Sequence, residues 1–263
     1  MKKESNVMKK LFHVFILITI ANCNVQAQSG WKIIQITTGS DNEVYEESLF
    51  IQDGKLKQSS QTVDVIIDFT TRKLTFINHG NHSYWRGSKI EFENEIEEFS
   101  KKMMIEAFGE EGYREYQKNM DAMKVEAHGK PMDIEIKEEN ESEMIGGFNG
   151  KKHSVYVNGD LMEELWLCSE INLTDEIDFQ IMQEFFKELS SNDEAAYSDS
   201  EEYISMLKNG GFPIKEIMWS FGEVINKTEL KEAMKQKIPA SAFQAPSDYS
   251  KGSLMDVMMQ QEY

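Results

Sequence analysis

The sequence predicts one antiparallel α+β domain that follows an export signal. Two dipeptides typical of tight hairpins, Asp53-Gly54 and Asn158-Gly159, each separate two runs of strand-like residues. Two stretches with apolar residues at steps of three and four, about 91–127 and about 175–207, interrupt these runs. The strands are thus joined mainly by hairpins and come in groups between helices, an order that is typical of an antiparallel α+β fold.

Residues 1–27 are typical of a secretory signal. Four lysines within the first ten residues precede an apolar run at 11–21. This run is too short to span a bilayer, for which roughly 20 residues are needed. Val25-Gln26-Ala27 predicts cleavage after Ala27. We therefore expect a protein exported to the periplasm or the extracellular space.

A second cleavage site is open, because Ile20-Ala21-Asn22-Cys23 approximates a lipoprotein signal. Cys23 would then be lipidated and would anchor the protein. No later apolar run is long enough to cross a membrane, so the protein is not expected to be an integral one. Residues 28–263 are expected to form a single domain.

The chain is strongly acidic, with a formal net charge of −18. Such a surface repels nucleic acid and anionic membranes, so we expect no nucleic-acid partner. Cys168 is the only cysteine left after cleavage at Ala27, which excludes an intramolecular disulfide in the cleaved chain. It ends an apolar run, and we expect it to be a buried free thiol.

Strands dominate the chain from Trp31 to Gly87. After the turn at Asp53-Gly54, the alternating or apolar runs 63–69, 74–77 and 82–85 follow at short intervals. Together they predict an antiparallel meander with one buried face.

Helical spacing follows at 91–127 and is broken at Gly109–Gly112. The apolar stripe of its first half comprises Phe92, Ile96, Phe99 and Met103.

Strand-like runs return at 132–137, 152–157 and 161–168. Thr174 is the expected cap of a helix whose stripe comprises Ile177, Ile181, Phe185 and Leu189. Ser198 and Glu201 have capping-box spacing before a short helix that Gly210-Gly211 ends. Residues 212–225 are predicted to form a strand, and 228–237 are compatible with strand or helix.

No candidate catalytic group stands out. His79 and His82 share one turn and could hold a metal ion with Asp68, but turn residues are usually solvated. Glu163 and Glu164 are neighbours in a strand, so they point to opposite faces and are predicted to be solvent-facing charges. Met120 and Met123, or Met255, Met258 and Met259, could bind Cu(I). Most of the other methionines fall on apolar helical stripes, where they are predicted to be pliable core fillers or to form an adaptable apolar binding surface. We therefore expect no enzyme activity, metal or cofactor.

The order of motifs resembles the family of exported bacterial proteins known as domain of unknown function 4412. The resemblance rests on Asp53-Gly54-Lys55-Leu56, Tyr84-Trp85-Arg86-Gly87, Glu164-Leu165-Trp166 and the run from Ile238 to Phe243. It implies the periplasmic lipoprotein-carrier fold, a strongly curved antiparallel sheet that forms an incompletely closed barrel, with amphipathic helices on its concave face. The insert 91–127 departs from this pattern and could fill a carrier's cavity.

The leading functional hypothesis is a non-catalytic envelope protein that binds an acyl chain or lipoprotein, as a carrier does. Its apolar seam is expected to contain Phe92, Ile96, Phe99, Met103, Ile181 and Phe185. The alternatives are a structural or protein-interaction module with a filled core and an acidic surface, and a metal-binding protein.

Overall fold

The computed structural model describes residues 29–127, 132–189 and 197–258, and among these the side chains of 120–127, Leu189 and Asp199 are left out. The predicted signal, with Cys23 and the expected cleavage site, therefore lies outside the described residues. The strands are β1 (Ser29–Gly39), β2 (Val44–Gln52), β3 (Lys55–Ser59), β4 (Val63–Asp68), β5 (Lys73–Asn78), β6 (Ser83–Ser88), β7 (Ile134–Ile145), β8 (Phe148–Val157), β9 (Asp160–Cys168), β10 (Phe212–Ser220), β11 (Glu223–Lys237) and β12 (Ser250–Lys251). The helices are α2 (Lys89–Ala127), α3 (Phe179–Leu189), α4 (Glu201–Gly210) and α5 (Leu254–Met258), with short 3₁₀ turns η1 (Tyr197–Asp199) and η2 (Ala240–Phe243).

All twelve described strands belong to one sheet, in the order β12-β6-β5-β4-β3-β2-β1-β11-β10-β9-β8-β7. Every pair is antiparallel except β12 with β6. The meander β1–β6 and the group β7–β11 are joined by the pairing of β1 with β11, from Ser29↔Lys237 to Gly39↔Asn226. The α+β class and the antiparallel meander are thus confirmed.

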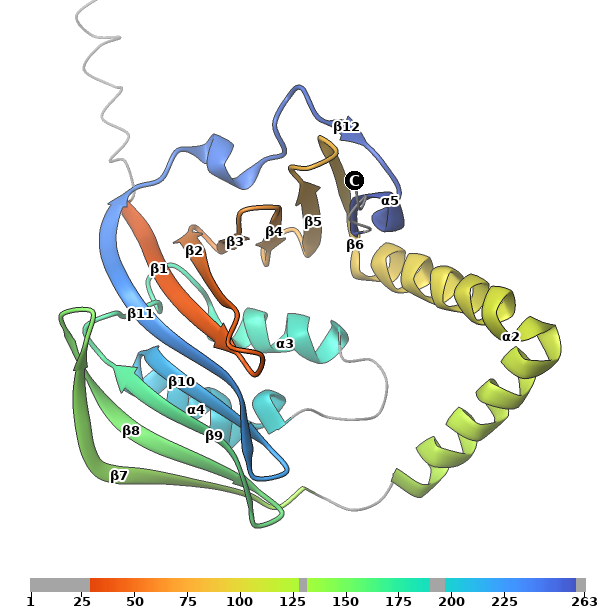
Figure 1. Ribbon diagram of the computed structural model, residues 1–263. Coiled ribbons are helices and arrows are strands. Elements are labelled where there is room, and N and C mark those ends of the chain that lie inside the picture. The colour runs from red at the N-terminus through yellow and green to blue at the C-terminus, as the bar shows by residue number, and fades with distance from the viewer. Residues whose placement is uncertain (1–28, 128–131, 190–196, 259–263) are drawn as a thin grey trace, which may run out of the picture.

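The predicted strong curvature and near closure are wrong. The order is linear, and the edge strands β12 and β7 are not hydrogen-bonded to each other. The chain passes from one side of the sheet to the opposite edge through α2 rather than through a closing strand pair (Figure 1). The sheet is therefore open and not strongly curled.

Helices α3 and α4 lie next to each other on one face of the sheet (Figure 1). On the inner side of α3, Phe185 is fully buried and packs edge-on against Phe69, with the ring centroids 5.6 Å apart. Beneath α4, Met206 packs on Val155, Leu165 and Leu167. Burial of these apolar faces holds both helices on the sheet.

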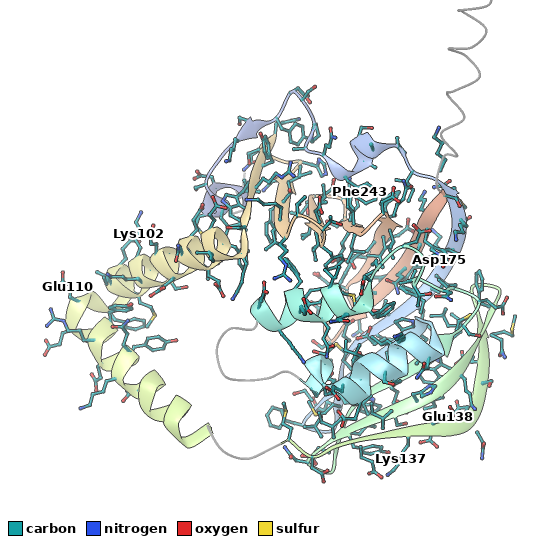
Figure 2. All side chains as sticks on the ribbon, turned by 180° about the vertical axis from the view of Figure 1, so that it is seen from behind. Lys102, Glu110, Lys137, Glu138, Asp175 and Phe243 are labelled. Atoms are coloured by element: carbon teal, nitrogen blue, oxygen red, sulfur yellow. The ribbon has the colours of Figure 1, made fainter. Side chains whose placement is uncertain are left out.

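Among the side chains that the structure describes, those of helix α2 that pack on the core lie near its start. Phe92 stacks on Phe76 at 5.6 Å, and the Glu95 carboxylate accepts hydrogen bonds from the Trp85 indole and the Leu254 amide, both at 2.7 Å. Gly109 breaks the helix with φ 73°, as the sequence predicts. Figure 2 shows Lys102 and Glu110 far from the sheet. The insert therefore does not fill the space over the sheet.

One predicted boundary is also wrong, and one open alternative is decided. Residues 212–225 are not one strand, because Phe221-Gly222 turns with φ 52° and 79° and separates β10 from β11. The stretch 228–237, ambiguous in sequence, is strand throughout.

Candidate functional site

The loop that connects β9 to α3 is tied to the sheet by its own backbone. The Asn172 carbonyl accepts the Trp31 indole N–H at 3.0 Å, and the Glu176 carbonyl accepts the Gly54 N–H at 2.7 Å. Asp53 and Gly54 have φ of 51° and 71°, which the predicted hairpin turn needs. The turn after β2 thus positions this loop.

Helix α3 begins later than the sequence predicts. Asp178, not Thr174, is its cap, since the Asp178 carboxylate accepts the N–H groups of Gln180 and Ile181 at 2.9 and 3.3 Å. Thr174 instead donates its N–H and hydroxyl to the Asn172 side chain, both at 2.8 Å. Ile177 belongs to the loop before the helix, and its side chain is buried.

Helix α4 is capped by Ser200 rather than Ser198, because the Ser200 side chain accepts the Tyr203 N–H. The predicted glycine stop is confirmed: Gly211 has φ 91° and donates its N–H to the Leu207 carbonyl. A Cβ at Gly211 would overlap the Cys168 carbonyl oxygen. Only glycine lets α4 end this close to β9.

A small apolar cavity of about 160 Å³ lies where this loop, α3, the end of α4 and the start of β10 meet. It is lined by Asn172, Leu173, Thr174, Ile177, Phe179, Met182, Leu207, Lys208, Gly211, Phe212 and Pro213. The lining is almost entirely apolar, so the cavity suits an apolar group.

An acidic cleft of about 540 Å³ shares Thr174, Ile177, Phe179 and Lys208 with the apolar cavity. Its other lining residues are Asp53, Gly54, Asp175, Glu176, Asp178 and Gln180. The two hollows are therefore adjacent, and the charged groups of the cleft lie beside the apolar cavity.

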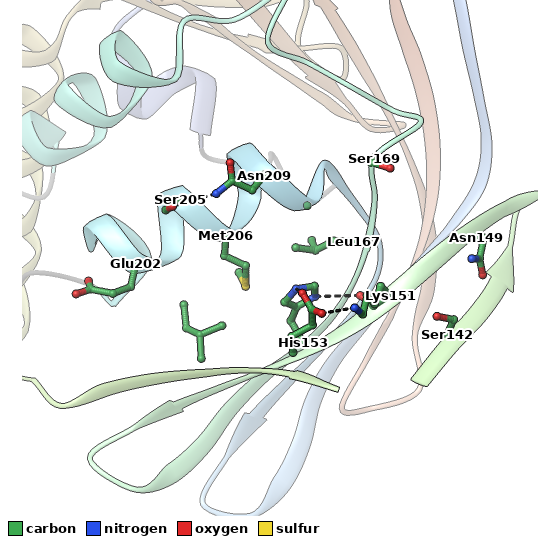
Figure 3. A pocket seen from close by; sticks show the side chains of 13 residues that line it. Ser142, Asn149, Lys151, His153, Leu167, Ser169, Glu202, Ser205, Met206 and Asn209 are labelled. Atoms are coloured by element: carbon green, nitrogen blue, oxygen red, sulfur yellow. Dashed lines mark hydrogen bonds and ion pairs between the residues drawn. The ribbon is translucent and has the colours of Figure 1, made fainter. Parts of the chain in front are cut away.

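A second cleft, polar and about 580 Å³, lies on the other side of α4 between that helix and β7–β9 (Figure 3). Its ionisable groups largely pair with one another. His153 Nδ1 donates to the Lys151 carbonyl at 3.0 Å, its Nε2 lies 3.6 Å from a Glu138 carboxylate oxygen, and Lys151 pairs with Glu138. This mutual pairing leaves little charge available for a ligand.

Glu163 is buried under α4, contrary to the prediction of a solvent-facing charge. Its carboxylate accepts hydrogen bonds from the hydroxyl groups of Tyr203 at 3.1 Å and Tyr197 at 3.4 Å. Burial and the nearby Glu216 carboxylate raise the pKa of Glu163 to about 8, and burial also raises the pKa of Glu216. The two carboxyl groups hydrogen-bond to each other, so at neutral pH the pair shares a proton.

The two faces of β9 explain this error. Glu163 and Glu164 do point to opposite faces, as predicted, but α4 covers the face of Glu163. Glu164 pairs with Lys152 at 2.7 Å on the other face. Leu165 and Leu167 share the face of Glu163, and this alternation was a usable signal that the face is buried.

The ring nitrogens of His79 are both engaged. Nε2 lies 3.0 Å from an Asp64 carboxylate oxygen, and Nδ1 lies 2.9 Å from the Tyr249 hydroxyl. Asp68, the suggested third ligand, instead accepts the Thr71 N–H. Among the described residues no group of three His, Cys, Asp or Glu side chains could hold a metal ion.

The predicted seam residues do not gather at one place. Phe185 is fully buried beneath α3, while Ile181 on the same helix is 37% exposed. Phe92 and Ile96 pack against the core from the start of α2, Phe99 is half-buried, and Met103 is 50% exposed. Of the apolar stripe predicted for this helix, Ile177 lines the cavity. Met182 and Leu207, which also line it, were not singled out by the sequence.

The sequence matches the family described as Domain of unknown function (DUF4412) over residues 113–249, more than half of the chain. The chain belongs to the DUF4412 family. No curated protein matches it. Within the ranges that the structure describes, no helix is long and apolar enough to cross a membrane. The DUF4412 match covers α3, α4, the loop before α3 and the second half of α2, but not the meander β1–β6.

Several solved structures are similar at low sequence identity. An uncharacterized conserved protein from Thermus thermophilus has a TM-score of 0.43 and 8% identity, covering 86% of this chain and 90% of that one. MucB in complex with MucA(peri) has a TM-score of 0.37 and 9% identity over 84% of this chain and 56% of MucB. PNGF-II has a TM-score of 0.36 and 10% identity over 82% of this chain and 30% of its own. Similarity at these TM-scores assigns no function.

Proposed function

We propose that this DUF4412 protein is a non-catalytic exported protein that binds an apolar or lipidated ligand by one apolar end. The observation that carries the proposal is the cavity of about 160 Å³ between α3, α4 and the sheet. Export is part of the proposal, and N-terminal sequencing of the secreted protein is expected to begin at Gln28. A lipidated Cys23 terminus would contradict free export.

The size of the cavity limits what it can hold. An apolar protein cavity of about 150 Å³ can bind benzene, so this cavity fits a group of about six carbons rather than a whole acyl chain. Burial of six methylenes contributes about 5 kcal/mol before the costs of association. After these costs the end group alone would bind weakly, with a dissociation constant of about 1 mM or higher.

Titration with 1-hexanol tests the proposal, because it supplies a six-carbon chain without charge. Trp31 donates to Asn172, which lines the cavity, so tryptophan fluorescence is expected to change saturably. Met182→Phe fills the cavity and is expected to weaken binding at least about tenfold.

Met103→Phe makes the same replacement at a half-exposed site on α2, outside the cavity lining, and is expected to leave binding unchanged. A non-saturable response to hexanol, or equal binding by Met182→Phe and the unmodified protein, would refute the proposal.

A second candidate function, a protein-interaction module, is favoured by the exposed apolar side chains of α2. Phe108 and Tyr116 are 66% and 45% exposed on a helix that leaves the body after its first turns. Deletion of residues 97–126 with a short glycine linker would separate the two functions. Hexanol binding survives this deletion under the first proposal, whereas an interaction module would lose its partner.

A further inference from the structure

The acidic cleft next to the apolar cavity carries an excess of negative charge. Four carboxylates line it, from Asp53, Asp175, Glu176 and Asp178, whereas Lys208 is the only cation among the lining residues. Lys235 approaches from β11, 3.6 Å from a Glu176 oxygen and 3.9 Å from an Asp175 oxygen. The charges that face the cleft therefore remain negative in sum, and they attract cations.

Three of these carboxylates are explained by local structure or by solvent. Asp178 caps α3, Asp53 accepts the Gln52 side-chain amide at 3.1 Å, and the Asp175 side chain is 76% exposed. Their charges contribute to the negative electrostatic potential of the cleft, but none of these three carboxylates requires a ligand.

Glu176 is different, because its side chain is only 4% exposed. Its Oε2 atom is buried without a hydrogen-bond partner, and its Oε1 has only the 3.6 Å approach of Lys235. A buried acceptor without a donor costs about 1–3 kcal/mol, and more when the group is charged. Because Glu176 also lines the cleft, a ligand bound there can supply the missing donor.

The backbone of Glu176 is held in place. The Glu176 carbonyl accepts from Gly54 at 2.7 Å, and its N–H donates to the Leu173 carbonyl at 2.9 Å. Gly54 in turn accepts the Phe69 N–H at 3.0 Å. The loop is therefore held on both sides of the residue, which keeps the base of the Glu176 side chain at the cleft. A rotation of the Glu176 side chain alone, without rearrangement of the loop, would bring its carboxylate to a cationic N–H donor in the cleft.

We propose that the cavity and the acidic cleft form one site for a cationic amphiphile, whose apolar group of about six carbons enters the cavity while its ammonium or guanidinium group binds at Glu176. This assignment rests on the proposed function and names its ligand class. A free fatty acid fits poorly, because its carboxylate would meet the carboxylates of the cleft. The same chemistry occurs in a free alkylamine and in a peptide with a basic residue next to an apolar one.

Three probes with the same six-carbon chain separate the head group from the tail. Isothermal titration calorimetry with hexylammonium, 1-hexanol and hexanoate is expected to rank them in this order of affinity, with at least about a tenfold gap between hexylammonium and hexanoate. Raising the salt concentration should reduce the difference in affinity between hexylammonium and hexanoate and leave the affinity for hexanol unchanged. Hexanol binding with no preference for hexylammonium would overturn the inference and leave the proposed function intact. No binding of any probe would refute both.

Glu176→Gln retains the shape and removes the charge, so it is expected to abolish the preference for hexylammonium while hexanol binds as before. Glu202→Gln removes an exposed charge on the opposite side of α4 and is the matched control. Asp175→Asn, at a 76% exposed site that folding does not depend on, should reduce the preference in part. An unchanged preference in Glu176→Gln or, if that variant does not fold, in Asp175→Asn would overturn the inference.

The peptide acetyl-Leu-Lys-amide distinguishes the two sources of this chemistry. Binding at least about tenfold tighter than hexylammonium would identify a peptide ligand, since extra backbone contacts add affinity. Weaker binding than hexylammonium would identify a free amine. In both cases competition by hexylammonium should place the ligand in the same site.

Discussion

Glu163→Gln is expected to change how the stability of the protein depends on pH. The pKa of Glu163 is raised to about 8 in the folded protein, whereas an unperturbed glutamate titrates near 4.5. A folded-state pKa above the unfolded one gives stability that is fully present below about pH 4.5 and is lost as pH rises through about 8. Within this window the folded state holds one more proton, so stability falls by up to about 1.4 kcal/mol per pH unit.

Glutamine imitates the protonated acid, because its amide can donate to Glu216 and its carbonyl can accept from Tyr203. The variant should therefore match the unmodified protein near pH 5 and exceed it by a few kcal/mol at pH 8. Urea unfolding at half-unit pH steps, followed by tryptophan fluorescence, measures both curves.

The other ionisable groups on this side of the sheet are retained in both proteins. Tyr197, Tyr203, Glu216 and His153 are present in each, so the difference between the curves reports on the coupled pair of Glu163 and Glu216. Glu202→Gln, an exposed charge on α4, corrects for the general repulsion in this acidic chain. Parallel pH curves for the unmodified protein and Glu163→Gln would refute the assignment of a shared proton to this pair.

Three further predictions follow from burial and backbone geometry. Gly211→Ala should lower the free energy of unfolding by at least about 2 kcal/mol, because its Cβ would overlap the Cys168 carbonyl, whereas Gly159→Ala, with a similar φ of 89° and open space around it, should cost only about 1 kcal/mol. Equal losses in urea unfolding would contradict the close packing of α4 on β9. Cys168, 1% exposed, should react with a thiol reagent only after denaturation, and rapid labelling of the native protein would disprove its burial. Met103→Asp should leave the unfolding free energy within about 0.5 kcal/mol and hexanol binding unaltered, since Met103 is 50% exposed, and a large loss in either would show that α2 packs on the body.

Local signals in the sequence predicted the turns well. Asp53-Gly54 and Asn158-Gly159 adopt the positive φ angles that their residue types favour. Phe221-Gly222 makes the same kind of turn, but phenylalanine rarely adopts a positive φ and its apolar side chain continued the strand pattern. Phe221 is fully exposed at that turn, although an apolar residue in a strand-like run is expected to be buried. Its residue type therefore gave no indication of the turn.

Contacts between distant segments could not be predicted in the same way. The stripes of α2 and α3 look alike in sequence, yet Phe185 is fully buried and Met103 is half exposed, because only α3 stays on the sheet. The cavity depends on where the end of α4 meets the loop before α3, and Gly211 and Gly54 fix that meeting through contacts with residues far along the chain. Glu176 gave no signal of its own, since its burial results from this docking.

Methyl NMR of protein labelled at the methionine methyl groups tests the central claim most directly. On titration with hexanol, we expect a saturable shift of the Met182 methyl, which lines the cavity. Met206 faces the polar cleft on the other side of α4, and Met103 lies on α2, so their methyl signals should stay in place. A shift confined to Met103 or Met206, or a uniform and non-saturable drift of all three, would contradict a binding site between α3 and α4.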